Sequence, residues 1–270
     1  MSKLIYKLQS IINISPSNNN TDINIARRLL KNLDKIDQQT NIHEFAELCY
    51  TSPSGFSRFA KKMGYMNFSE FKRDVLNIKE ELDETIIEYH GQDKLDMHDI
   101  LHHITDALNK IDYARLNRQI DQLCEYMYSA SRIILFASFV PGDLASILQR
   151  AMLTIGKYAE FYPRIEHQAE SVRQLAQNDL CLFLSTDASW HDQKSIIFPA
   201  MLSDAKTVLI TQNQHIKYSK QLSLMIDLGP CNDELTEKYK LLFFLDCLIN
   251  RYLNKYVVER HALQHNPHAK

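Results

Sequence analysis

The sequence predicts neither a membrane span nor a signal peptide. None of its apolar runs approaches the ~18 residues of a membrane span. The first ten residues contain two lysines but no continuous apolar core or small-residue cleavage site, so we expect no signal peptide. With 45% hydrophobic and 24% charged residues, the composition predicts a globular protein without a membrane partner.

Cysteine is scarce and scattered, and no C-x-x-C pair occurs. The residues are Cys49, Cys124, Cys181, Cys231 and Cys247. An odd number at wide spacing argues against a disulfide framework and against a cysteine zinc site. We therefore expect the protein to reside in the reducing cytoplasm.

Recognisable catalytic motifs are also missing. There is no glycine-rich mononucleotide loop, no G-x-S-x-G elbow and no convincing triad. His98 and His102 have a spacing that can hold a metal, but a solvated helix face is the favoured interpretation. His261, His265 and His268 fall in a polar C-terminal tail. We predict no catalytic residue, no metal and no cofactor.

Charge is unevenly distributed along the chain. Residues 1–80 contain 12 Lys+Arg and 8 Asp+Glu, whereas the remaining residues contain 19 and 25. A basic first part followed by an acidic second part is typical of a protein whose first domain binds the phosphates of a nucleic acid.

The first 79 residues predict a small helical domain. Apolar residues recur at helical spacing from Leu4 to Ile12 and again from Ile25 to Ile36, with Thr21 as the expected cap of the second helix. Two short helices and a long one from about Asn67 follow.

The densest signal is a pair of capped short helices. Asn41 and Glu44 form a capping-box pattern, and after a turn Ser52 can cap a second helix with Pro53 at its first position. Gly64 suits the left-handed position after that helix. A short helix, a tight turn and a second helix make up a helix-turn-helix.

The second helix segregates its side chains. Phe56, Phe59, Ala60 and Met63 share the face expected to be buried, and hydroxyls and cations occupy the rest. Such cations and hydroxyls can contact guanine edges and phosphates in the major groove, although a solvated surface helix is the alternative. The predicted DNA contacts are Ser52, Ser54, Gly55, Ser57, Arg58, Lys61 and Lys62.

From Arg132 the sequence pattern becomes that of an α/β domain. Short continuously apolar runs at 133–137, 180–184, 207–211 and 224–228 suit strands buried on both faces, and Phe161 can belong to a fifth. Helix-length segments separate them, which predicts right-handed βαβ units in a doubly wound parallel sheet. We expect a helix-turn-helix domain at 1–79, a linker at 80–107 and the α/β domain at 108–260.

The helix-turn-helix closely resembles that of the RpiR/MurR family of bacterial regulators. The resemblance lies in residues 41–46 (NIHEFA), 51–65 (TSPSGFSRFAKKMGY) and 67–72 (NFSEFK). That family joins this head to a sugar isomerase (SIS) domain, a parallel α/β module that usually binds phosphosugars. The order of elements from Leu108 onwards resembles that module, as does LTIGK at 153–157.

The ligand motifs depart from the family pattern. The glycines and serine of its Gly-x-Gly-x-Ser-type turn are replaced in ASFVPG at 137–142, where Pro141 also removes a donor. Its Ser-x-Ser-Gly turn reads STDA at 185–188, and Asp187 would repel a phosphate unless a cation intervened. The pocket therefore takes another ligand or is vestigial. The candidate effector contacts are Ser138, Phe139, Ser185, Thr186, Asp187 and Ser189.

The resemblance implies a transcription regulator. Its expected partners are double-stranded DNA, a second copy in a homodimer or dimer of dimers, and a small-molecule effector such as a sugar derivative, which need not be a phosphosugar. A phosphosugar isomerase or lyase on the same module is the enzyme alternative, and the missing phosphate motifs count against it. A third alternative is an SIS-like part that only dimerises.

Overall fold

The computed structural model describes residues 3–13, 20–91, 96–186, 194–230 and 234–258. The chain divides into two compact units, Met1–Leu95 and Asp96–Lys270. Among the described residues no helix is both long and apolar enough to cross a bilayer.

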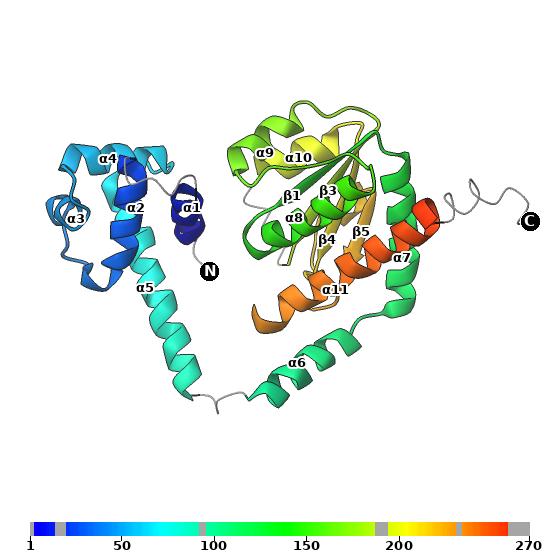
Figure 1. Ribbon diagram of the computed structural model, residues 1–270, viewed down its shortest axis with the longest axis horizontal. Helices are drawn as coiled ribbons and strands as arrows, with labels where there is room; N and C mark the ends of the chain where they lie inside the picture. The colour runs from blue at the N-terminus through cyan, green and yellow to red at the C-terminus, as the bar shows by residue number, and fades with distance from the viewer. Residues whose placement is uncertain (1–2, 14–19, 92–95, 187–193, 231–233, 259–270) are drawn as a thin grey trace, which may run out of the picture. The chain divides into compact units, whose positions relative to one another are not determined.

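The first unit is helical (blue to cyan in Figure 1). Its elements are α1 (Lys3–Ile12), α2 (Thr21–Lys31), the 3-10 helix η1 (Leu33–Lys35), α3 (Ile42–Leu48), α4 (Pro53–Lys62) and α5 (Phe68–Gly91). The apolar stripes predicted from the sequence meet in one core, which contains Leu4, Leu29, Phe45, Phe59 and Phe71 among others.

The cap of α2 lies one residue before the predicted one. Asn20 accepts hydrogen bonds from the backbone N–H groups of Asp22 and Ile23, and Thr21 is the first helical residue. The expectation for Thr21 is wrong because the short asparagine amide reaches the free N–H groups from the preceding, extended position.

The second unit alternates strands and helices. Its elements are α6 (Met97–Asn109), α7 (Tyr113–Ser129), β1 (Arg132–Ala137), α8 (Phe139–Thr154), β2 (Ala159–Phe161), α9 (Ile165–Val172), β3 (Asp179–Ser185), α10 (Lys194–Leu202), β4 (Lys206–Thr211), the 3-10 helix η3 (Ser219–Gln221), β5 (Leu224–Asp227), α11 (Glu234–Leu253) and the π-helix η4 (Asn254–Val258).

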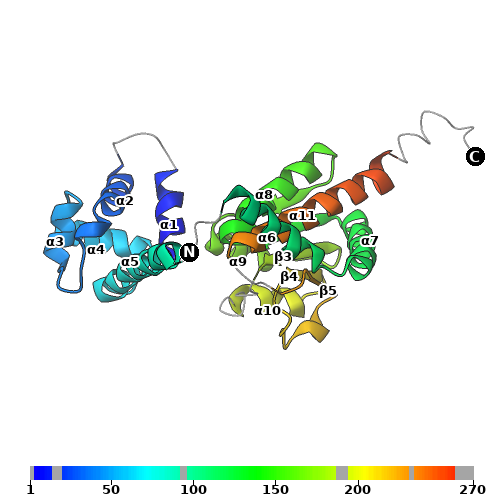
Figure 2. The same ribbon diagram turned by 90° about the horizontal axis from the view of Figure 1, so that it is seen from below.

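The five strands form one parallel sheet in the order β2-β1-β3-β4-β5. In β1, Ile133 and Leu135 enter the core beneath α7, α8 and α11, while Ile134 and Phe136 enter the core beneath α9 and α10. Figure 2 shows α8 and α11 on one side of the sheet and α10 on the other. The predicted doubly wound fold is confirmed, because both faces of each strand are buried and the apolar runs are therefore continuous.

The interval 80–107, predicted as a linker, is largely helical where the structure describes it. α5 continues to Gly91, and α6 begins at Met97 after an Asp96 capping box and packs on α11. The division between the two compact units falls inside this interval. The boundaries at 79 and 108 stay predictions.

Candidate DNA-binding and effector sites

Two local caps shape the helix-turn-helix. The Asn41 side chain accepts from the N–H groups of His43 and Glu44, and the Glu44 carboxylate accepts from the Asn41 N–H at 2.6 Å. Ser52 Oγ accepts from the Gly55 N–H at 3.1 Å, and Pro53 opens α4. Gly64 follows α4 with a φ of +86°. The predicted start signals of both helices and the predicted end signal of α4 are confirmed.

An aromatic cluster holds α4 in place. Phe56 and Phe59 are buried, and their rings contact Phe71 of α5 in edge-on or tilted arrangements at centroid distances of 5.4 and 6.3 Å. Phe45 of α3 lies 5.3 Å from Phe56 in the same way. This packing places one face of α4 in the core.

The opposite face of α4 carries the predicted DNA contacts. Ser54, Arg58 and Lys61 are exposed together with Ser52, whose hydroxyl lies 3.0 Å from that of Ser54. Ser57 is half-buried at the margin. Hydroxyl and cationic groups therefore lie along one accessible face of a helix that follows a tight turn.

Two of the predicted DNA-contact residues already make interactions within the first compact unit. Lys62 donates to Asp22 of α2 at 2.7 Å. Gly55 uses its N–H in the Ser52 cap, and a Cβ added there would lie 2.6 Å from Thr51 Oγ1. A side chain at position 55 would therefore force the Thr51 hydroxyl to move, whatever the contact of this residue with DNA.

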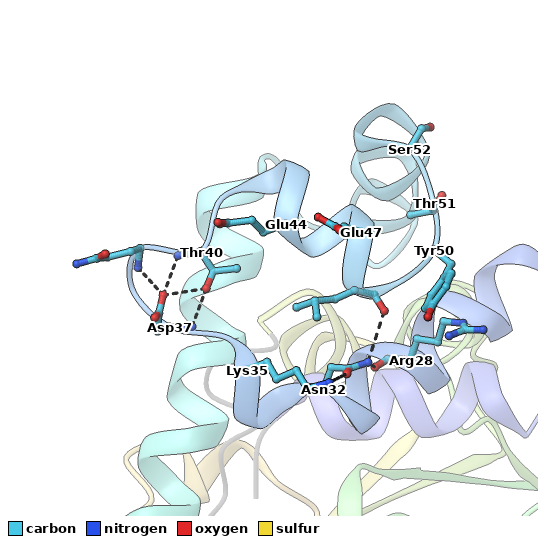
Figure 3. Close-up of a pocket in the computed structure, with 12 residues that line it drawn as sticks. Arg28, Asn32, Lys35, Asp37, Thr40, Glu44, Glu47, Tyr50, Thr51 and Ser52 are labelled. Atoms are coloured by element: carbon cyan, nitrogen blue, oxygen red, sulfur yellow. Dashed lines mark hydrogen bonds between the residues drawn. The ribbon is translucent and has the colours of Figure 1, made fainter.

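A groove of about 1070 Å³ adjoins the turn before α4 (Figure 3). Tyr50, in the turn, is 78% exposed and has a φ of +52°, and the Arg28 guanidinium lies 3.7 Å from the centroid of its ring. At another part of the groove, hydrogen bonds from Thr40 and Gln39 lower the pKa of Asp37 below its usual value. Sequence reasoning missed Arg28 and Tyr50, since their contact joins α2 to the turn between α3 and α4, which are distant in the sequence.

The first turn predicted to contact an effector forms the start of a helix. α8 begins at Phe139, where the family pattern has a glycine, and Phe139 has a φ of +59°. Ser138 precedes the helix without capping it through its side chain. Pro141 and Gly142 are buried in its first turns, so Pro141 removes one N–H from the helix end that would face an anion.

The second effector turn is only partly described. Ser185 ends β3, and both it and Thr186 are buried. The Thr186 carbonyl accepts from the Gln212 N–H at 2.9 Å. Asp187 and Ser189 lie outside the described residues. Because β1 and β3 are parallel neighbours, Ser138 and Ser185 lie at the same edge of the sheet.

Two buried glutamines at this edge were not predicted. Gln168 of α9 donates through Nε2 to the carbonyls of Ala137 and Tyr162 at 2.8 and 2.7 Å, which fixes the orientation of its amide. Gln212, directly after β4, donates through Nε2 to the Glu237 carbonyl. In the described part of the chain, both Oε1 atoms are buried without a hydrogen-bond partner. No sequence pattern around these glutamines indicates that their side chains are buried at the edge of the sheet.

The histidine pair on α6 forms no metal cluster among the described residues. His98 and His102 have ring centroids 6.3 Å apart, and His102 Nδ1 lies 3.1 Å from an Asp106 carboxylate oxygen on an exposed surface.

Comparison with known proteins supports a regulator. No protein-family model matches the chain. A curated HTH-type transcriptional regulator from the aarA 3' region of Providencia stuartii is 24% identical over 217 residues, which cover 78% of this chain and 75% of the relative.

Solved structures share the fold. The Vibrio vulnificus NanR protein, complexed with ManNAc-6P, matches with a TM-score of 0.53 and 20% identity over 98% of this chain and 97% of its own. The sugar isomerase domain of the RpiR transcription factor from Sphaerobacter thermophilus matches with a TM-score of 0.51 and 12% identity, covering 63% of this chain and 94% of that one. The chain is thus similar in sequence to HTH-type transcriptional regulators, and its second unit has the fold of a sugar isomerase (SIS) domain.

Proposed function

We propose that the protein regulates transcription in the cytoplasm by binding duplex DNA through the outer face of α4, with Ser52, Ser54, Arg58 and Lys61 as its main contacts. The observation that carries this proposal is the separation of α4 into a buried aromatic face and an exposed face of hydroxyls and cations. Ser57, Gly55 and Lys62 lie at the margin of the same surface. A recognition helix needs this arrangement to enter the major groove.

The SIS-fold domain is proposed to bind a small sugar derivative at the carboxyl edge of β1, β3 and β4. The Vibrio vulnificus relative is complexed with ManNAc-6P, and the edge of this chain offers Ser138, Phe139, Ser185 and Thr186, with Asp187 and Ser189 beyond the described residues. The unpartnered Oε1 atoms of Gln168 and Gln212 suit hydroxyl or amide N–H donors.

The protein is proposed to act as a homodimer or a dimer of dimers. Ile147 and Leu153 of α8 are 41% and 47% exposed, so this helix offers apolar surface for a second copy. Two heads related by a twofold axis would read an inverted repeat with half-sites spaced by helical turns.

Binding of the full chain to DNA fragments from around its own gene tests the regulator proposal. Each phosphate contact should add about 0.9 to the slope of log affinity against log salt. We expect a steep slope and protection of an inverted repeat. Affinity that does not change with salt, or no binding to any fragment, would falsify the proposal.

A further inference from the structure

Tyr50 occupies a position that the fold alone does not explain. Its φ of +52° is in the left-handed region, which an aromatic side chain rarely adopts, and the ring is 78% exposed. Burial therefore contributes little to keeping a tyrosine here, and glycine or asparagine would suit the backbone better. A strained, exposed aromatic residue beside a binding surface is a candidate contact.

Arg28 supplies the second half of the feature. Its guanidinium carbon lies 3.7 Å from the centroid of the Tyr50 ring, close enough for a cation–π contact. Within the part of the chain that the structure describes, no carboxylate pairs with this guanidinium. The ring thus holds the Arg28 guanidinium in place and leaves its charge unneutralised. Because the side chain is already restrained, a ligand that binds it loses less conformational entropy.

The pair lies next to the proposed DNA-binding surface. Figure 3 shows Ser52, Thr51, Tyr50 and Arg28 in succession along one edge of the groove. Glu44 lies farther from this edge in the same view, with Glu47 between it and Thr51, and the Glu44 carboxylate is already engaged by the Asn41 N–H. Electrostatics therefore favour binding of a polyanion along the edge with Tyr50 and Arg28, and oppose it beside the carboxylates of Glu44 and Glu47.

We propose that Arg28 and Tyr50 together bind one phosphate of the DNA backbone beside the N-terminus of α4. The guanidinium supplies charge and N–H donors, and the phenol supplies one O–H donor. Such a contact positions the recognition helix without reading a base. This inference rests on the proposed DNA binding and adds residues from α2 and the turn to it.

The test compares Arg28→Gln and Tyr50→Asn with wild type in the full chain. Asparagine tolerates the left-handed backbone, so the turn keeps its conformation while the ring is lost. Each variant should weaken binding to the operator fragment about tenfold, as expected for one charge-assisted hydrogen bond. Arg28→Gln should also lower the salt slope by about 0.9.

Because the two side chains act as one unit, the double variant should bind about as weakly as the weaker single variant. Arg73→Gln is the matched control, since Arg73 is an exposed arginine of α5 outside the groove. It should leave both affinity and slope unchanged. Thermal unfolding midpoints should agree among all the proteins.

The outcomes separate the two proposals. If wild type binds and Arg58→Ala weakens it, but Arg28→Gln and Tyr50→Asn behave like Arg73→Gln, this inference is overturned and the proposed function stands. If wild type binds no DNA, the proposed function fails and the inference with it. If Tyr50→Asn lowers the unfolding midpoint, the salt slope of Arg28→Gln becomes the test. A slope lower by about 0.9 supports the inference, and an unchanged slope overturns it.

Discussion

Neighbouring residues of α4 are placed in opposite environments, so their substitutions should separate binding from folding. Arg58 is exposed, whereas Phe59 keeps only 1% of its surface accessible. Arg58→Ala and Lys61→Ala should each weaken operator binding by about 1–3 kcal/mol if a base contact is lost. Their unfolding midpoints should equal that of wild type. Unfolding of either variant would show that the assignment of faces is wrong.

Phe59→Ala should give the reverse pattern. Loss of a buried phenyl ring that contacts Phe56 and Phe71 should lower the free energy of unfolding by about 3–5 kcal/mol. Urea denaturation measures this loss. If the Phe59→Ala variant kept the wild-type free energy of unfolding, that result would contradict the aromatic core described above.

Burial also determines the reactivity of the thiols. Desolvation raises the pKa values of Cys49, Cys124 and Cys181 to about 12. Below that pH the native thiols stay protonated, and the thiolate is the reactive form. We expect these three to react with a disulfide reagent at pH 8 only after denaturation, as counted by peptide mass spectrometry. Rapid labelling of any of them in the native protein would disprove this placement.

At the scale of the element, capping matters most where a helix is short. α3 has seven residues, and a helix of that length is marginal without help from its ends and its packing. Asn41→Ala removes the side chain that accepts from two N–H groups and should lower the free energy of unfolding by about 1 kcal/mol. Asn41→Ser, which keeps a capping oxygen, is the control. Equal stability of the alanine and serine variants in urea would argue against the cap.

At the scale of the whole molecule, the SIS-fold domain should bind simple phosphosugars without useful affinity. Pro141 lacks an N–H at the start of α8, and the sequence has a carboxylate, Asp187, two residues after the end of β3. A like charge at about 4 Å opposes binding by roughly 4 kcal/mol at an effective dielectric constant of 20. Calorimetry with hexose and amino-sugar phosphates beside their unphosphorylated forms should therefore show that the phosphorylated compounds bind about a thousandfold more weakly than a matching unphosphorylated compound that binds.

Divalent cations and a pH series belong in that experiment, because a bound cation or protonation of Asp187 would cancel the repulsion. Asp187→Ser should tighten binding of the phosphorylated compounds. Micromolar binding that requires the phosphate in the wild-type protein would contradict the prediction and favour an ordinary phosphosugar site.

Local chemistry in the sequence was enough to predict most of the elements. Asn41, Ser52 and Gly64 mark helix ends because caps act within a few residues. The runs that became β1 and β3 are continuously apolar because both faces of a parallel sheet are covered. The sequence by itself therefore determined the two-part architecture and the outward face of α4.

Contacts between distant residues were decided only by the tertiary structure. Arg28 of α2 contacts Tyr50 in the turn before α4, Lys62 pairs with Asp22 instead of remaining on the proposed DNA face, and Gln168 donates to the Ala137 carbonyl at the end of β1. No local pattern encodes these pairs, because they depend on how separate elements pack. The left-handed backbone of Tyr50 and Phe139 is a similar case: neither residue favours that conformation, so the surrounding structure imposes it.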